Sequence, residues 1–198
     1  MIKLFSSPTC PDSHRTRIVL EEKELPVDMI DVESENMPAS LLSANPYGRL
    51  PTLVDRDTVL FEPTVVNEYL DERYPHPPLK PGSPAERAQM RLAVLRIEQD
   101  LYPLFHALEK EKSKKKGDAV KKMRTYLESI DTHLARQEYF IGESYTLADV
   151  AMAPVLWRLQ CNGVDTADFA NLEAYMDRLF ERPAFERSLS EHEQMMRN

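Results

Sequence analysis

The first 78 residues alternate apolar runs that predict strands with segments whose apolar residues fall at helical spacing. Residues 2–5 form a short apolar run, and after a loop rich in turn formers residues 14–25 favour a helix. A second strand is predicted at 26–32, and a short helix opened by a proline at 38–45. The chain therefore begins in the order strand, helix, strand, helix.

A hairpin and a third helix are predicted next. Two β-rich runs, Thr52–Val54 and Thr58–Phe61, flank a short charged turn, as in a two-stranded hairpin. Residues 63–74 follow with apolar positions near helical spacing and with Pro63 suited to a first helical turn. The order βαβαββα predicts an α/β domain with a mixed sheet covered by helices.

The pattern changes after Pro84. Residues 85–182 show no strand-like alternation, and their apolar residues recur three and four apart, which predicts an all-α bundle. Pro103 is expected to kink a long helix rather than end it, and Cys161 is expected to be a small core residue inside an apolar helix. The expected division is an α/β domain, a linker and an all-α domain at residues 1–78, 79–84 and 85–198.

A helix start within the second domain is unusually well specified. In the segment YTLADV, Thr146 is suited to the N-cap and Asp149, three residues later, is suited to accept from the amide of the cap residue. Tyr145 and Val150 would pack as a hydrophobic staple. These residues predict a structural cap rather than a chemical site.

Composition limits the function classes. Of the 198 residues 42% are hydrophobic and 29% are charged, and no apolar run approaches the roughly 18 residues of a membrane span. The first ten residues are typical of a folded strand rather than a signal peptide. Cys10 and Cys161 lie far apart without metal-like spacing. We therefore expect a globular cytoplasmic protein without membrane association, metal or cofactor.

The charge pattern leaves two interpretations open. The formal net charge is −8, which argues against wrapping nucleic acid, yet residues 110–122 hold seven lysines against two acidic residues. This cluster is either a basic patch for DNA or an acidic protein, or a solvated connection between helices. It lacks interleaved aromatic residues, and the chain has no recognition-helix motif or base-reading arginine array, so direct sequence-specific DNA binding is not expected.

The segment Tyr69–Pro84 carries five prolines around His76, more than are needed to end a helix and turn the chain. Prolines are common at domain junctions, so the segment would then be a stiffened linker. Consecutive prolines also present a rigid apolar surface with little backbone entropy left to lose, which favours binding. Sequence pattern alone leaves both interpretations open.

Motifs spread over the whole chain resemble known families. The βαβαββα order, the segment RLPTLVD before the hairpin and the TLAD capping box resemble the glutathione transferase fold, with a thioredoxin-like first domain and a helical second one. In that fold the proline matching Pro51, after Leu50, is cis and holds the strand edge that receives the cysteine backbone of glutathione.

Four further segments sharpen the resemblance: LVDRD, YLDERYPHPPL, LWRL and RLFERPAFERSLSEHEQMMR together resemble the stringent starvation protein A family. The resemblance implies binding to RNA polymerase holoenzyme, with the sigma subunit as one candidate contact, and altered promoter use under stress and starvation. It also implies a homodimer without glutathione transferase activity. It assigns the polymerase contact to a surface pocket lined by Pro75, His76, Pro77 and Pro78.

The main alternative is a glutathione-dependent monothiol oxidoreductase or transferase. The segment CPDSHRTR resembles the cysteine–proline opening of omega-class transferases and glutaredoxins, and a helix N-terminus at Cys10 would lower the thiol pKa. His14 and Arg15 would add positive charge nearby. Ser13 stands where a resolving cysteine would be, so exchange would use one thiol. The other interpretation is that Cys10 is a plain loop cysteine.

The binding side of that alternative is weakened at the start of the third helix. Transferases carry an acidic residue followed by serine there, whose hydroxyl and amide bind the γ-glutamyl carboxylate. Here the pair is Glu62–Pro63, and only Thr64 remains as a substitute. We therefore expect a transcription regulator without catalytic residues. A partner subunit of another transferase-like chain, with a client other than polymerase, is a further alternative.

Overall fold

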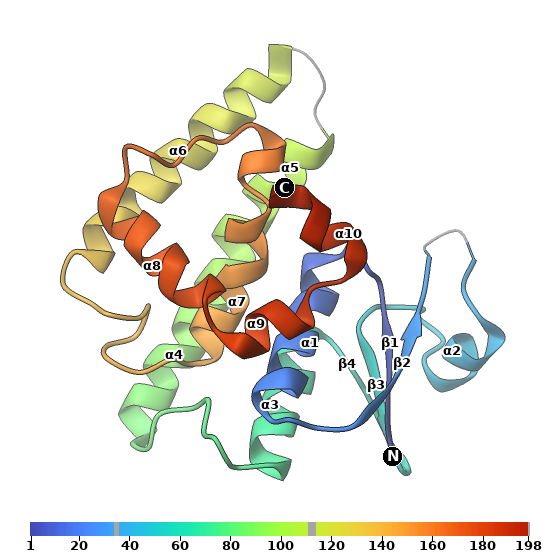
Figure 1. Cartoon of the computed structure of the whole chain (residues 1–198). Helices are drawn as coiled ribbons and strands as arrows, with labels where there is room; N and C mark the ends of the chain where they lie inside the picture. The colour runs from blue at the N-terminus through green and yellow to red at the C-terminus, as the bar shows by residue number, and fades with distance from the viewer. Residues whose placement is uncertain (34–35, 111–113, 198) are drawn as a thin grey trace. The chain divides into compact units, whose positions relative to one another are not determined.

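The computed structural model describes residues 1–33, 36–110 and 114–197, and the chain divides into two compact units. The first unit comprises Met1–Pro78 together with Pro183–Met196, and the second comprises Leu79–Arg182 together with Arg197. Figure 1 shows the helices and strands of both units.

The first unit contains a four-stranded mixed sheet in the order β2-β1-β3-β4. Strand β1 pairs in parallel with β2 and antiparallel with β3, and β3 and β4 form the hairpin. The strands are β1 Ile2–Ser6, β2 Val27–Asp31, β3 Thr52–Asp55 and β4 Thr58–Phe61. The predicted βαβαββα order is therefore confirmed.

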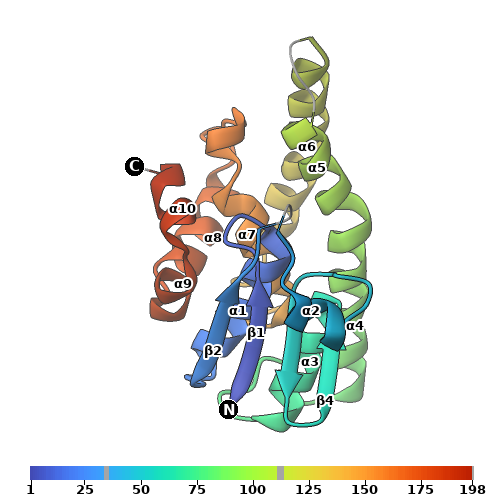
Figure 2. The ribbon, with the colours of Figure 1, turned by 90° about the vertical axis from the view of Figure 1, so that its right-hand side faces the viewer.

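Helices cover both faces of this sheet. Helices α1 (Pro11–Glu22) and α3 (Pro63–Arg73) lie on one face, and the short α2 (Ala39–Ala44) lies on the other (Figures 1 and 2). On the α2 face, Phe5 and Leu41 belong to a buried cluster against which half-buried Leu50 packs. On the α1 face the core residues include Ile18, Leu53, Val66 and Leu70, all fully buried.

The C-terminal tail differs from the sequence expectation of one helical domain at 85–198. Helices α9 (Pro183–Ser188) and α10 (Glu191–Gln194) belong to the first unit, and α9 packs against α1. The reason is a buried polar network between α1 and the tail, which sequence pattern alone does not reveal. Within the expected linker 79–84, Leu79 is buried in the second unit, where its carbonyl accepts from the Leu147 amide.

The described part of the second unit is helical, as predicted, apart from one isolated β-bridge between Tyr139 and Gly142. Its α-helices are α4 Pro84–Arg96, α5 Tyr102–Lys110, α6 Lys114–Leu134, α7 Leu147–Trp157 and α8 Ala170–Phe180. A π-helical turn, η1 (Ile97–Leu101), joins α4 to α5, and the Tyr102 amide donates to the carbonyl of Ile97, five residues earlier. This widened turn directly precedes Pro103, which has no amide hydrogen, so the helix is distorted there without ending.

Helix α7 is the central element of the second unit, because every residue from Leu147 to Leu156 is buried. The helix ends at Trp157, and a 3-10 turn, η2 (Gln160–Asn162), follows with Gly163 at φ +80°. Cys161 lies on η2 and is exposed, so its prediction as a core residue was wrong. The apolar segment continues in sequence, but the chain turns out of the helix before this cysteine.

The lysine cluster falls mainly on helix α6. Residues 111–113 lie outside the described residues, and α6 begins at Lys114.

A last short 3-10 turn, η3, covers Met195–Arg197. None of the helices in the described residues combines the length and the apolar composition that a membrane-spanning helix needs.

Candidate functional site

The Pro75–Pro78 loop follows α3 directly and is exposed at all four residues. Helix α3 ends at Arg73 and Tyr74 is its C-cap, as expected before a proline. The His76–Pro77 peptide bond is cis. The loop thus displays three prolines and a histidine at the surface of the first unit.

A buried lysine holds this loop from inside. Lys23 is the C-cap residue of α1, and its side chain is completely buried. Its Nζ lies 2.6 Å from Oδ1 of Asp71, a buried residue of α3, and it also donates to the carbonyl of Pro77. One ammonium group therefore connects α1, α3 and the exposed loop.

Polar contacts also connect the β3–β4 hairpin to α3. The Tyr69 hydroxyl donates to Oδ2 of buried Asp55 at 2.8 Å, and Arg73 Nε lies 4.0 Å from the same oxygen. Desolvation, followed by the hydrogen bond to Asp55, raises the pKa of Tyr69. These contacts fix the helix from which the proline loop emerges.

Cys10 occupies the N-cap position of α1, and Pro11 begins the helix. The cysteine is half-buried and its side chain makes no capping hydrogen bond. His14 is fully buried, and its Nε2 lies 2.9 Å from Oγ of Ser188 in the tail. The sequence grouped His14 with Cys10, but the structure places its ring in the network of the tail.

The positions that match the glutathione-binding residues of transferases lie around the start of α3: Leu50, Pro51, Glu62, Pro63 and Thr64. The Leu50–Pro51 peptide bond is cis. Glu62 is the N-cap residue of α3 with φ +69°, a conformation that costs on the order of 1–3 kcal/mol for a residue with a side chain. Its carboxylate pairs with Arg49 at 2.5 Å, and Pro63 occupies the first helical turn.

Sequence reasoning missed the role of Arg15 at this place. The side chain of Arg15 is almost fully buried, and its Nη2 donates to Oγ1 of Thr64 at 3.0 Å. Thr64 is the residue that the sequence left as the only substitute for the missing serine. Its hydroxyl accepts a hydrogen bond from the protein itself, while Pro63 offers no backbone donor.

A buried ionic network joins α1 to the tail. Arg17 Nη2 donates to both carboxylate oxygens of Glu193, at 2.7 and 2.6 Å, and Arg17 Nε donates to the carbonyl of Ser188 at 2.9 Å. His14 Nδ1 lies 3.6 Å from Oε1 of Glu193. Nothing in the sequence pattern marks these residues as buried, because each stands in a strongly polar segment.

The capping box on α7 is present, as the segment YTLADV predicts. The Thr146 amide donates to Oδ2 of Asp149 at 2.7 Å, and the Ala148 amide donates to Oγ1 of Thr146. Oδ1 of Asp149 also accepts from the Phe140 amide and from the Tyr175 hydroxyl, at 2.8 and 2.7 Å. Burial raises the pKa of Asp149, which these hydrogen bonds oppose, and burial beside Asp149 raises the pKa of Tyr175 well above its ordinary value.

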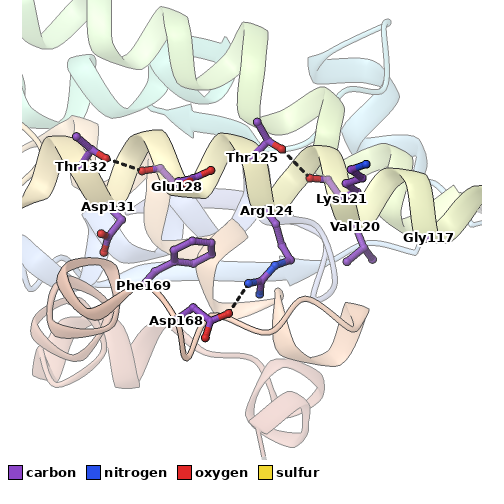
Figure 3. A pocket seen from close by; sticks show the side chains of 10 residues that line it. All are labelled: Gly117, Val120, Lys121, Arg124, Thr125, Glu128, Asp131, Thr132, Asp168 and Phe169. Atoms are coloured by element: carbon purple, nitrogen blue, oxygen red, sulfur yellow. Dashed lines mark hydrogen bonds and ion pairs between the residues drawn. The ribbon is translucent and has the colours of Figure 1, made fainter.

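A cleft of about 720 Å³ lies on the second unit between α6 and the segment before α8 (Figure 3). Arg124 reaches across it to Oδ2 of Asp168 at 2.7 Å, and its guanidinium lies over the ring of Phe169. Asp131 accepts from the amides of Asn171 and Leu172 and so caps α8. These charges connect α6 to α8, which indicates a structural role. Among the described residues, no group of histidine, cysteine, aspartate and glutamate is suited to hold a metal ion.

Comparison with known sequences places the chain among glutathione transferase-like proteins. Residues 9–73 match the family Glutathione S-transferase, N-terminal domain, and residues 92–183 match Glutathione S-transferase, C-terminal domain. Among solved structures, glutathione transferase Omega 3C from Trametes versicolor is similar, with a TM-score of 0.87 and 25% identity. That match covers 99% of this chain and 88% of the other.

Curated relatives narrow the family further. A stringent starvation protein A homolog from Pasteurella multocida is 43% identical over 191 residues, which cover 96% of this chain and 90% of the relative. Another, from Coxiella burnetii, is 41% identical over 199 residues, which cover 100% of this chain and 95% of the relative. With its transferase fold and this similarity over nearly its full length, the chain belongs to the stringent starvation protein A family.

Proposed function

We propose that this protein is a transcription regulator that binds RNA polymerase holoenzyme through the Pro75–Pro78 loop and alters promoter use under stress. The observation that carries the proposal is an exposed proline–histidine loop whose Pro77 carbonyl accepts a hydrogen bond from buried Lys23. The proposal includes a cytoplasmic location, where bacterial polymerase acts. It assigns the protein no catalytic residue.

The physical basis of binding is the low cost of ordering this loop. Prolines fix φ near −65°, so Pro75, Pro77 and Pro78 have little backbone freedom to lose when a partner binds. Their rings offer apolar surface, and His76 adds a hydrogen-bonding group between them. Exposed Glu72 lies three residues before Pro75 and is suited to a basic surface on the polymerase.

The mechanism would be competition or bridging. A regulator docked on the core enzyme or on its sigma subunit shifts the population of polymerase that engages each promoter, by mass action. The net charge of −8 favours basic protein surfaces over DNA. Direct DNA contact is therefore not part of the proposal.

Removing the loop side chains is expected to abolish binding. In fluorescence anisotropy with labelled protein and purified holoenzyme, we expect saturable binding for the wild type. We expect at least a hundredfold weaker binding for Pro75→Ala/His76→Ala/Pro77→Ala, because central contact residues dominate interface energies. Far-ultraviolet circular dichroism would check that the triple variant is folded.

The matched control is Pro46→Ala/Tyr47→Ala, which also removes a proline and a ring from an exposed loop of the first unit. We expect this control to bind like the wild type. Equal weakening in both variants would contradict a contact centred on the Pro75–Pro78 loop. Absence of wild-type binding would overturn the function itself and favour a different client.

We also propose that the protein forms a homodimer. Helix α4 exposes Leu92 and Leu95, whose side-chain positions lie one helical turn apart on the same face and are 58% and 46% exposed. A second copy covering this apolar stripe would remove it from water. In sedimentation velocity we expect a dimer for the wild type and a shift to monomer for Leu92→Glu/Leu95→Glu. A wild-type monomer at micromolar concentration would contradict the proposal.

A second candidate function rests on Cys10. This cysteine stands at the N-cap of α1, where helix amides and the helix dipole favour a thiolate. Against it, Pro63 has no backbone amide hydrogen, so an incoming carboxylate loses the amide donor that serine supplies at this position. Glutathione-dependent disulfide reduction that is lost in Cys10→Ser would favour this enzyme over the regulator.

A further inference from the structure

The Lys23 side chain is completely buried, although the charged sequence around it is typical of a solvent-exposed helix end. Lysine is almost never fully buried without a partner, because an ammonium loses its hydration in the protein interior. Its neighbours in sequence, Glu22 and Glu24, do not explain its burial. The Lys23 side chain instead enters the protein toward α3.

The Lys23 ammonium donates hydrogen bonds to two oxygens, one on α3 and one in the Pro75–Pro78 loop. Oδ1 of Asp71 lies 2.6 Å from Nζ, within the last turn of α3, and the Asp71 side chain is 4% exposed. The second is the carbonyl of Pro77 in the exposed loop. Since α1 and α3 pack side by side on the sheet, the pair forms a rigid base to which the loop is attached.

We propose that Lys23 and Asp71 are positioning residues that set the placement of the Pro75–Pro78 loop for its partner. Prolines stiffen the loop internally, but they do not fix its orientation against the sheet and helices. The hydrogen bond from Lys23 supplies that orientation, because it holds a main-chain carbonyl at the middle of the loop. Preorganisation of this kind lowers the ordering cost on binding. This inference rests on the proposed function of the loop.

The competing interpretation is that Lys23 and Asp71 only stabilise the fold. Variants that remove one charge or both charges distinguish this role from positioning of the loop. Lys23→Met alone leaves the Asp71 carboxylate buried without its ammonium, which destabilises the fold whatever the loop does. Lys23→Met/Asp71→Asn removes both charges at nearly constant volume, so no uncompensated charge stays buried. The double variant is therefore expected to remain folded, and it lacks the ammonium that binds the carbonyl of Pro77.

The experiment compares this double variant with a control pair elsewhere in the same unit. Arg17→Met/Glu193→Gln removes another buried ion pair without touching Lys23 or the loop. Each protein is measured for thermal stability, for holoenzyme affinity by anisotropy, and for loop order by the nuclear magnetic resonance signals of the His76 ring. The last measurement does not depend on polymerase.

We expect Lys23→Met/Asp71→Asn to keep a cooperative unfolding transition, to broaden or multiply the His76 signals, and to bind holoenzyme about tenfold to a hundredfold more weakly. The control pair should keep the His76 signals and the affinity of the wild type. Unchanged His76 signals in the Lys23 double variant would overturn the inference.

The outcomes also separate this inference from the proposed function. If the triple loop variant loses binding while the Lys23 double variant binds like the wild type, the function stands and the positioning role fails. If the wild type does not bind polymerase, the function fails, and the His76 signals still decide whether Lys23 orders the loop.

Discussion

Replacing Arg17 by methionine is expected to lower the free energy of unfolding by about 3–5 kcal/mol, because it leaves the buried Glu193 carboxylate without its main partner. The carboxylate of Glu193 is 0% exposed, and both of its oxygens accept from Arg17. The same variant removes the hydrogen bond from Arg17 to the carbonyl of Ser188. The tail would then lose one of its buried attachments to α1.

Chemical denaturation would measure this loss, and a double variant would identify its cause. Arg17→Met/Glu193→Gln is expected to recover a large part of the lost stability, since no unpaired buried charge remains. The exposed pair between Arg187 and Glu21 offers a comparison, and Arg187→Met should change stability little. An Arg17→Met protein as stable as the wild type would show that the tail is not held by this pair.

The Asp149→Ala variant is expected to lose about 3–5 kcal/mol of stability, because four hydrogen-bond donors lose their acceptor at once. These donors are the amides of Phe140 and Thr146 and the hydroxyls of Thr146 and Tyr175. Each buried group left without a partner costs about 1–3 kcal/mol. The loss should therefore exceed the roughly 1 kcal/mol of an ordinary helix cap.

Two further variants test this explanation by thermal or urea denaturation. Asp149→Asn keeps one acceptor oxygen and the shape of the side chain, so its loss should fall between those of the wild type and Asp149→Ala. Glu86→Ala breaks the exposed capping box of α4, where water replaces the missing acceptor, and its effect should be much smaller. Similar losses at Glu86 and Asp149 would contradict a role for burial.

The sequence pattern predicts the secondary structure of this chain because residues close together in sequence determine most of its elements. The hairpin at residues 52–61 follows from two β-rich runs around a charged turn, and the α7 cap follows from Thr146 and Asp149 three residues apart. The distortion before Pro103 follows from the sequence, since a missing amide hydrogen is a property of the residue itself. Cys161 was misplaced because apolar character alone does not show where a helix ends.

The features of the candidate site also differ in how far local sequence predicts them. The two-part fold, the family resemblance and the proline loop follow from the sequence, because they depend on composition and on residues close together in the chain. Which charged residues are buried depends on tertiary packing: Lys23 pairs with Asp71, and Arg17 pairs with Glu193 from the opposite end of the chain. Their partners are 48 and 176 residues away, and a polar segment looks the same in sequence whether its charges face water or one another.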